Sequence, residues 1–263
     1  MQILDVVSPV FGATCRILVA DGGGCVVVDA GAGVATRVLD VVRRAGLRPA
    51  AVLATHGHVD HTWDAAVLAA ELDVPVVLHV ADAYRLDDPF GTLGVLGGGA
   101  PHAVSGPLAQ ALAAAGMPPQ EYLRPERVEP FGTLDPDRDA DTVLELGGLR
   151  IVARHAPGHT EGSTLYLLGD LDLLGDTNPA GDVGPLGDLD RAAEGEPLVA
   201  LTGDVLFAGS IGRTDLPGGD GAQMARTLRE VVATLPPATR VLPGHGPESD
   251  IATELVRNPY LPR

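Results

Sequence analysis

Short apolar runs rich in valine and leucine recur along the chain, and they constrain its fold more than any other feature of the 263 residues. Gly, Pro, Asp or His bounds each run, as is typical of buried β-strands. Strands are predicted at 16–20, 25–29, 51–54, 76–79, 149–154, 163–168, 198–202 and 239–242. Helical patterns are predicted at 34–42, 62–72, 107–115 and 223–235. This alternation predicts an α/β fold with central strands and outer helices.

The charged residues exclude several kinds of chemistry. All 18 basic residues are arginine, so a Schiff-base lysine and the lysine of a phosphate-binding loop are ruled out. With 35 acidic residues the formal charge is −17, which argues against nucleic-acid and anionic-membrane partners. No signal peptide or transmembrane run is recognised, and Cys15 and Cys25 are interpreted as buried free thiols. We therefore expect a cytoplasmic protein.

A cluster of histidines follows directly on the predicted strand at 51–54. The segment reads THGHVDH, so His56, His58, Asp60 and His61 fall within six residues. Imidazole and carboxylate are ligands that first-row divalent metals accept. In an extended turn the i, i+2 histidines point in one direction, and Asp60 and His61 then begin the next helix, where they can face a second metal. The pattern therefore predicts a metal site.

Three further candidate ligands each follow an apolar run. His159 stands in APGHT, Asp204 in TGD and His245 in PGHG. Each motif taken alone fits an ordinary turn. Together with THGHVDH they lie just beyond the ends of predicted strands, where α/β folds place their sites.

The order THGHVDH, APGHT, TGD, PGHG resembles the metallo-β-lactamase superfamily along nearly the whole chain. The segment from Asp204 to Asp220 and the tail RNPYL at 257–261 are similar to bacterial glyoxalase II-like hydrolases. The resemblance implies one domain over 1–263, a four-layer αββα sandwich with a metal site at one edge, and insertions near 84–142 and 169–197.

The same resemblance implies two divalent metal ions, with zinc expected and iron or manganese as alternatives. The implied ligands are His56, His58 and His159 for the first metal, Asp60, His61 and His245 for the second, and Asp204 as the bridge. Asp29 matches an early aspartate of the family and would support the histidine turn. From spacing alone, Asp29 fits a turn at the end of a strand equally well.

The resemblance implies hydrolysis of a small-molecule thioester by a metal-activated hydroxide, with Asp60 as proton acceptor as well as ligand. Arg213 is expected either to bind a substrate carboxylate or to pair with Asp215 or Asp220. The missing lysine and the Gly246-Pro247 after His245 depart from the glutathione-using enzymes, which leaves the acyl group and the carrier thiol open.

Two alternatives remain open on the same scaffold. One is a persulfide dioxygenase with a single iron held by His56, His159 and Asp204, and the other is a hydrolase of lactones or other esters. A homodimer is one of the assemblies that the sequence leaves open. The remaining histidines, His79, His102 and His155, are interpreted as structural or surface residues.

Overall fold

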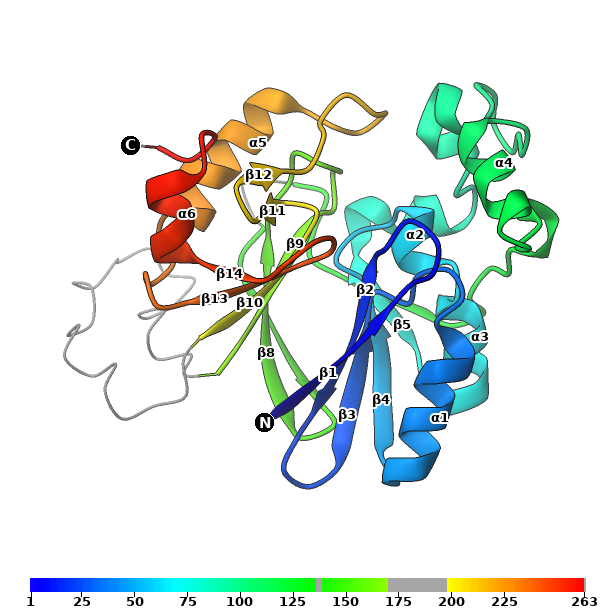
Figure 1. Ribbon diagram of the computed structural model, residues 1–263, viewed down its shortest axis with the longest axis horizontal. Helices are drawn as coiled ribbons and strands as arrows, with labels where there is room; N and C mark the ends of the chain where they lie inside the picture. Colours follow the sequence, from blue (N-terminus) through cyan, green and yellow to red (C-terminus); the bar gives the residue numbers. More distant parts are fainter. Residues whose placement is uncertain (136–138, 170–197, 263) are drawn as a thin grey trace.

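The computed structural model describes residues 1–135, 139–169 and 198–262, and it contains two six-stranded β-sheets (Figure 1). The first sheet follows the chain order β1 (Gln2–Val7), β2 (Thr14–Val19), β3 (Gly24–Val28), β4 (Arg48–Leu53), β5 (Val76–His79) and β6 (Val128–Phe131). The strands β1 to β3 pair antiparallel, whereas β3 to β6 are parallel. The carboxyl ends of β3, β4 and β5 therefore meet at one edge.

The second sheet has the spatial order β14-β13-β10-β9-β8-β7. Its strands are β7 (Thr142–Leu146), β8 (Leu149–His155), β9 (Thr164–Leu168), β10 (Val199–Gly203), β13 (Arg240–Pro243) and β14 (Ser249–Asp250). Both β8 and β10 are antiparallel to β9, and β13 is parallel to β10. The carboxyl ends of β8, β10 and β13 therefore lie at one edge. A short hairpin joins β11 (Leu206–Phe207) to β12 (Ser210–Ile211).

Helices lie outside the two sheets (Figure 1). In the first half they are α1 (Ala35–Ala45), α2 (Val59–Thr62), α3 (Ala65–Leu72), η1 (Val80–Leu86), η2 (Gly91–Gly97), α4 (Pro107–Ala114) and η3 (Pro119–Glu121). In the second half they are α5 (Gly221–Thr227), η6 (Leu228–Val232) and α6 (Ile251–Arg257).

Three apolar cores separate these layers. Val38 of α1 and Leu68 of α3 belong to a core with the outer face of the first sheet. Leu53 and Tyr166 belong to the core between the two sheets. Leu228 of η6 belongs to a core on the outer face of the second sheet. The order helix, sheet, sheet, helix confirms the predicted four-layer αββα sandwich.

The structure differs from the sequence expectation at the edge strands and at one helix. The edge strands β1, β6, β7 and β14 were not predicted. The first three mix partly buried with exposed residues, so they carry no continuous apolar run, and β14 has only two residues. The helix predicted at 62–72 is divided into α2 and α3 at Trp63 and Asp64. The Asp64 carboxylate accepts a hydrogen bond from the Ala35 amide (2.7 Å), which ties this break to the start of α1.

The predicted insertion near 84–142 forms mainly helices that pack beside the histidine turn. Phe90, Leu93 and Leu112 share an apolar cluster with Val59 and Trp63, which belong to α2 and the residue after it. Apart from Gly169, the insertion predicted at 169–197 lies outside the described residues. Among the helices of the described segments, none combines the length and apolar character that crossing a membrane requires.

Candidate metal centre

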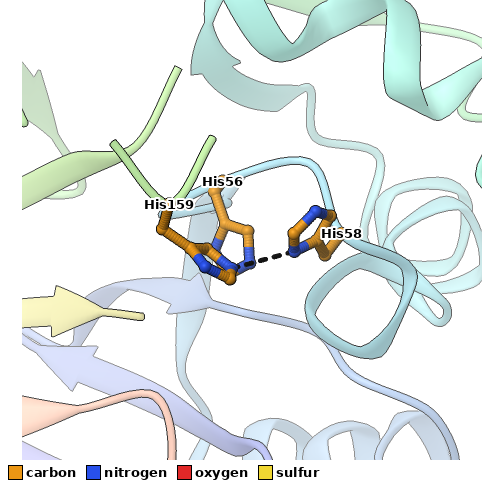
Figure 2. Close-up of side chains that lie close together, drawn as sticks. All are labelled: His56, His58 and His159. Carbon is orange, nitrogen blue, oxygen red and sulfur yellow. Dashed lines mark hydrogen bonds between the residues drawn. The ribbon is translucent and has the colours of Figure 1, made fainter. Parts of the chain in front are cut away.

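The turn that follows β4 and the turn that follows β8 bring three histidines together. Figure 2 shows the rings of His56, His58 and His159 converging, with His58 Nδ1 2.9 Å from His159 Nε2. The centroid of the His56 ring lies 4.8 Å from that of His58 and 4.7 Å from that of His159. All three rings are buried. The structure thus joins two ligands from the first sheet to one from the second.

A second group lies beside the first. His61 Nε2 is 3.2 Å from His245 Nε2, and His245 Nε2 is 3.4 Å from Asp60 Oδ2. Asp204 faces both groups, because its Oδ1 is 3.3 Å from His61 Nε2 and its Oδ2 is 3.7 Å from His159 Nε2. All seven side chains that the sequence nominated as ligands therefore lie in one cluster, with Asp204 between the two groups.

The outer nitrogens of three rings lie close to neighbouring polar groups. His159 Nδ1 donates to the Arg213 carbonyl (2.7 Å), and His56 Nδ1 lies 3.1 Å from the Thr55 hydroxyl. Because the Thr55 hydroxyl itself donates to Asp29 Oδ2 (2.9 Å), its oxygen is free to accept from His56. His61 Nδ1 is 3.1 Å from Asp29 Oδ2. In each of these rings Nδ1 thus faces a neighbouring group and Nε2 points into the cluster, the arrangement that metal-binding histidines usually adopt.

The inner atoms of the cluster fit divalent metal ions. His56 Nε2 is buried and has no hydrogen-bond partner in the described part of the protein. Nitrogen lone pairs and carboxylate oxygens face one another across short distances, which is costly unless a cation lies between them. A set of five imidazoles and two carboxylates without thiolate suits zinc, iron or manganese.

In the absence of metal, the histidines of the two ligand groups differ in pKa. Burial, together with the charge of His61, lowers the pKa of His56 well below its usual value, and burial and His159 lower that of His58 to about 3. Burial would also lower the pKa of His61 and His245, but neighbouring carboxylates outweigh it. The Asp204 and Asp29 carboxylates raise the pKa of His61, and Asp60 and Asp204 raise that of His245.

We expect the second metal to leave before the first as the pH falls. Protons compete with a metal for a histidine, and a raised pKa lets them compete at higher pH. His61 and His245 therefore take up protons while His56 and His58 are still neutral. Zinc content measured after dialysis at decreasing pH should fall in two steps, one ion at a time. The His245→Ala protein, which holds a single ion, should lose it only in the step at lower pH. Loss of both ions in one step would contradict this expectation.

The other nominated residues lie at the edge of the cluster. Asp29 also accepts a hydrogen bond from the Thr55 amide (2.7 Å), so this one carboxylate contacts the start of the histidine turn and His61. Arg213 is half exposed and pairs with Asp215 through two bonds of 2.7 and 2.8 Å. Its backbone carbonyl, rather than its side chain, contacts His159.

Sequence reasoning missed some supporting residues. Arg16 is buried on β2 and donates from Nη1 to the Pro243 carbonyl (2.7 Å), and the Thr14 amide donates to the Gly244 carbonyl (2.8 Å). These bonds fasten the turn that carries His245 to the opposite sheet. The sequence signal for this role is an arginine within an otherwise apolar run. A buried charge needs a partner, so such an arginine indicates a structural contact.

His79, Asp139 and His155 form a separate group. Asp139 Oδ2 is 2.8 Å from His79 Nε2 and 2.6 Å from His155 Nδ1, and the two rings are stacked with 9° between their planes. A nitrogen of each ring lies at hydrogen-bond distance from the same Asp139 oxygen, so a hydrogen-bonded network accounts for the group without a metal. His79 Nδ1 also accepts from the Ala81 amide (3.2 Å), which leaves its proton on Nε2, facing Asp139.

Comparison with known sequences finds a matching family and several relatives along nearly the whole chain. The model of the metallo-beta-lactamase superfamily matches residues 17–199. An uncharacterized protein of Mycobacterium tuberculosis is 33% identical over 99% of this chain and 98% of its own length. A probable metallo-hydrolase, YqgX, of Bacillus subtilis is 28% identical (95% and 92%). The hydroxyacylglutathione hydrolase GloC of Haemophilus influenzae is 27% identical (99% and 97%).

Solved structures show the same architecture. The BLEG-1 B3 metallo-beta-lactamase superposes with a TM-score of 0.70 at 25% identity, covering 100% of both chains. TTHA1623, solved in a di-iron-bound form, superposes with a TM-score of 0.64 at 27% identity, covering 98% of this chain and 100% of its own.

Proposed function

Since this chain belongs to the metallo-β-lactamase superfamily, we propose that it is a binuclear metal-dependent hydrolase that cleaves the thioester of a small hydroxyacyl thiol. The observation that carries the proposal is the pair of ligand groups sharing Asp204. Seven donors in two groups suit two ions better than one closed structural site, which needs only four ligands. The similarity to a hydroxyacylglutathione hydrolase over 99% of the chain supports the thioester as substrate.

When bound, two divalent ions supply Lewis-acid chemistry, lowering the pKa of water toward neutrality and polarising the substrate carbonyl. The first ion would be held by His56, His58 and His159, the second by Asp60, His61 and His245, with Asp204 shared. In the overall reaction the oxygen of water bonds to the carbonyl carbon, the C–S bond breaks, and the sulfur leaves as a thiol.

The chain's own residues prepare this chemistry in two ways. Burial alone would raise the pKa of Asp60, but His61 and the hydrogen bond to His245 outweigh it and lower the pKa, so the carboxylate is ionised at neutral pH. With its side chain partly exposed, Asp60 can accept a proton from the attacking water. Asp29 and the Arg213 carbonyl face the outer nitrogens of His61 and His159, which directs the inner nitrogen of each ring toward the other ligands.

Thiol release compared with oxygen uptake tests the proposal. Purified protein loaded with zinc is expected to release thiol from an S-lactoyl thioester without consuming oxygen. Iron-loaded protein incubated with a thiol persulfide is the matched arm, because a persulfide dioxygenase on this scaffold would consume oxygen there. Oxygen uptake with one iron per chain, and no thiol release, would overturn the hydrolase in favour of that alternative.

We further propose that Arg213 binds an anionic group of the substrate, exchanging its bond to Asp215 for one to the ligand. The half-exposed guanidinium stands next to the carbonyl that holds His159, and the overall charge of −17 leaves few other attractive groups for an anion. We expect Arg213→Gln to raise KM about tenfold with little change in kcat, because a charged hydrogen bond is lost equally from substrate and transition state.

A matched control is Asp215→Asn, which releases the guanidinium without removing it. In steady-state assays this variant should leave KM unchanged or lower it. If Arg213→Gln and Asp215→Asn altered KM alike, the arginine would act only by ordering its own loop.

A further inference from the structure

Asp82 is a fully buried carboxylate that the proposed chemistry does not use. It lies in the first turn of η1, directly after β5, and its side chain has no exposed surface. It accepts four hydrogen bonds. Its Oδ2 accepts from the Gly57 amide (2.7 Å) and the Thr160 hydroxyl (2.7 Å), and its Oδ1 accepts from the Gly162 amide (2.9 Å) and from Arg85 Nε (3.2 Å).

These bonds join the two turns that carry the first ligand group. Gly57 stands between His56 and His58, whereas Thr160 and Gly162 follow His159 on the other sheet. One carboxylate therefore links the turn that carries His56 and His58 to the turn that carries His159. No other side chain in the described residues is recorded with hydrogen bonds to both turns.

Asp82 and Arg85 pack closely against two glycines of these turns. A Cβ at Gly162 would lie 2.7 Å from the Asp82 side chain, and a Cβ at Gly57 would lie 2.9 Å from the Asp82 carbonyl oxygen and from Arg85. A buried carboxylate is costly unless it is paired. Arg85, which is also buried and additionally binds Glu161 and the Pro217 carbonyl (3.0 Å), supplies the opposite charge.

We propose that Asp82 is a positioning residue that sets the affinity of the first metal ion by fixing the distance between the His56–His58 turn and His159. The inference rests on the two-metal centre of the proposed function. It assigns Asp82 no contact with substrate or metal. Partners of this kind typically change metal affinity about 10- to 100-fold when they are removed.

The test is the zinc Kd measured by competition with a chromophoric chelator, in backgrounds that isolate each site. His245→Ala protein retains the complete first group, and His58→Ala protein retains the complete second group. Asp82→Asn keeps the shape but places an NH₂ group against either the Gly57 or the Gly162 amide. It is expected to raise the zinc Kd about 10- to 100-fold in the His245→Ala background and to leave it unchanged in the His58→Ala background.

Asp88→Asn is the matched control. The Asp88 carboxylate likewise accepts two backbone amides, from Gly91 (2.8 Å) and His102 (2.7 Å), but it touches neither ligand turn. This variant should leave both zinc affinities unchanged. An equal loss in both backgrounds, or an unchanged first site, would overturn the positioning role of Asp82.

A milder pair of variants keeps the test decisive if Asp82→Asn does not fold. Thr160→Val removes one of the four bonds and is expected to raise the zinc Kd of the first site about tenfold, whereas Thr160→Ser should retain wild-type affinity. Equal affinities of the two Thr160 variants would contradict the inference. Because the readout is zinc binding, a protein that binds zinc as expected but cleaves no thioester would refute the proposed function and leave this result standing.

Discussion

Asp204→Ala is expected to lower kcat/KM for thioester hydrolysis about a thousandfold or more. The Asp204 carboxylate faces both ligand groups, 3.3 Å from His61 and 3.7 Å from His159. Its removal would take a shared negative ligand from both of the proposed ions and leave their positive charges without the carboxylate between them. Activation of water at neutral pH then fails, because it depends on correctly held ions.

The measurement combines steady-state thiol release with zinc content per chain, and both are expected to fall. Asp40→Asn serves as the matched control, since this exposed carboxylate on α1 pairs only with Arg44 and lies in an outer layer. It should keep wild-type rate and zinc content. Full activity of Asp204→Ala would show that the two groups do not work through a shared ligand.

Tyr166→Ala is expected to lower the free energy of unfolding by about 3–5 kcal/mol, the range typical of truncating a large buried aromatic side chain. Tyr166 is fully buried on β9 in the core between the two sheets, where it packs near Phe131. Its hydroxyl also donates to the Ala54 carbonyl (2.9 Å), directly before the turn that carries His56 and His58. The substitution thus leaves a cavity and frees a carbonyl at the base of the site.

Urea unfolding of metal-free protein measures this loss, because bound zinc would itself add stability to the folded state. Tyr166→Phe separates the two contributions. It keeps the ring and loses only the hydrogen bond, so it should lower the free energy of unfolding by about 1–2 kcal/mol. Equal losses in the two variants would mean that the cavity contributes nothing.

The candidate ligands could be identified from the sequence because each of them follows a buried strand. His56, His159, Asp204 and His245 come directly after apolar runs, and parallel strands bring such ends to one edge of a sheet. The alternation of strands and helices was likewise sufficient to predict the layered fold. Both signals are local in the chain, so a single sequence carries them.

What escaped prediction depends on contacts between distant segments. Asp82 looks like an ordinary residue at the start of a helix until β5 and β8 are placed together in space. The role of Arg16 emerges only when the Pro243 turn of the other sheet reaches it. The edge strand β7 alternates partly buried with exposed residues, so its composition alone does not predict a buried strand. Its antiparallel pairing with β8 stabilises it as a strand.

Titration of metal-free protein with zinc shows whether two metal ions act together on a thioester. Thiol release from an S-lactoyl thioester is followed as zinc is added in fractions of an equivalent. We expect the rate to reach its maximum only when two zinc ions are bound per chain. A maximum at one equivalent, or no thiol release at two, would contradict it.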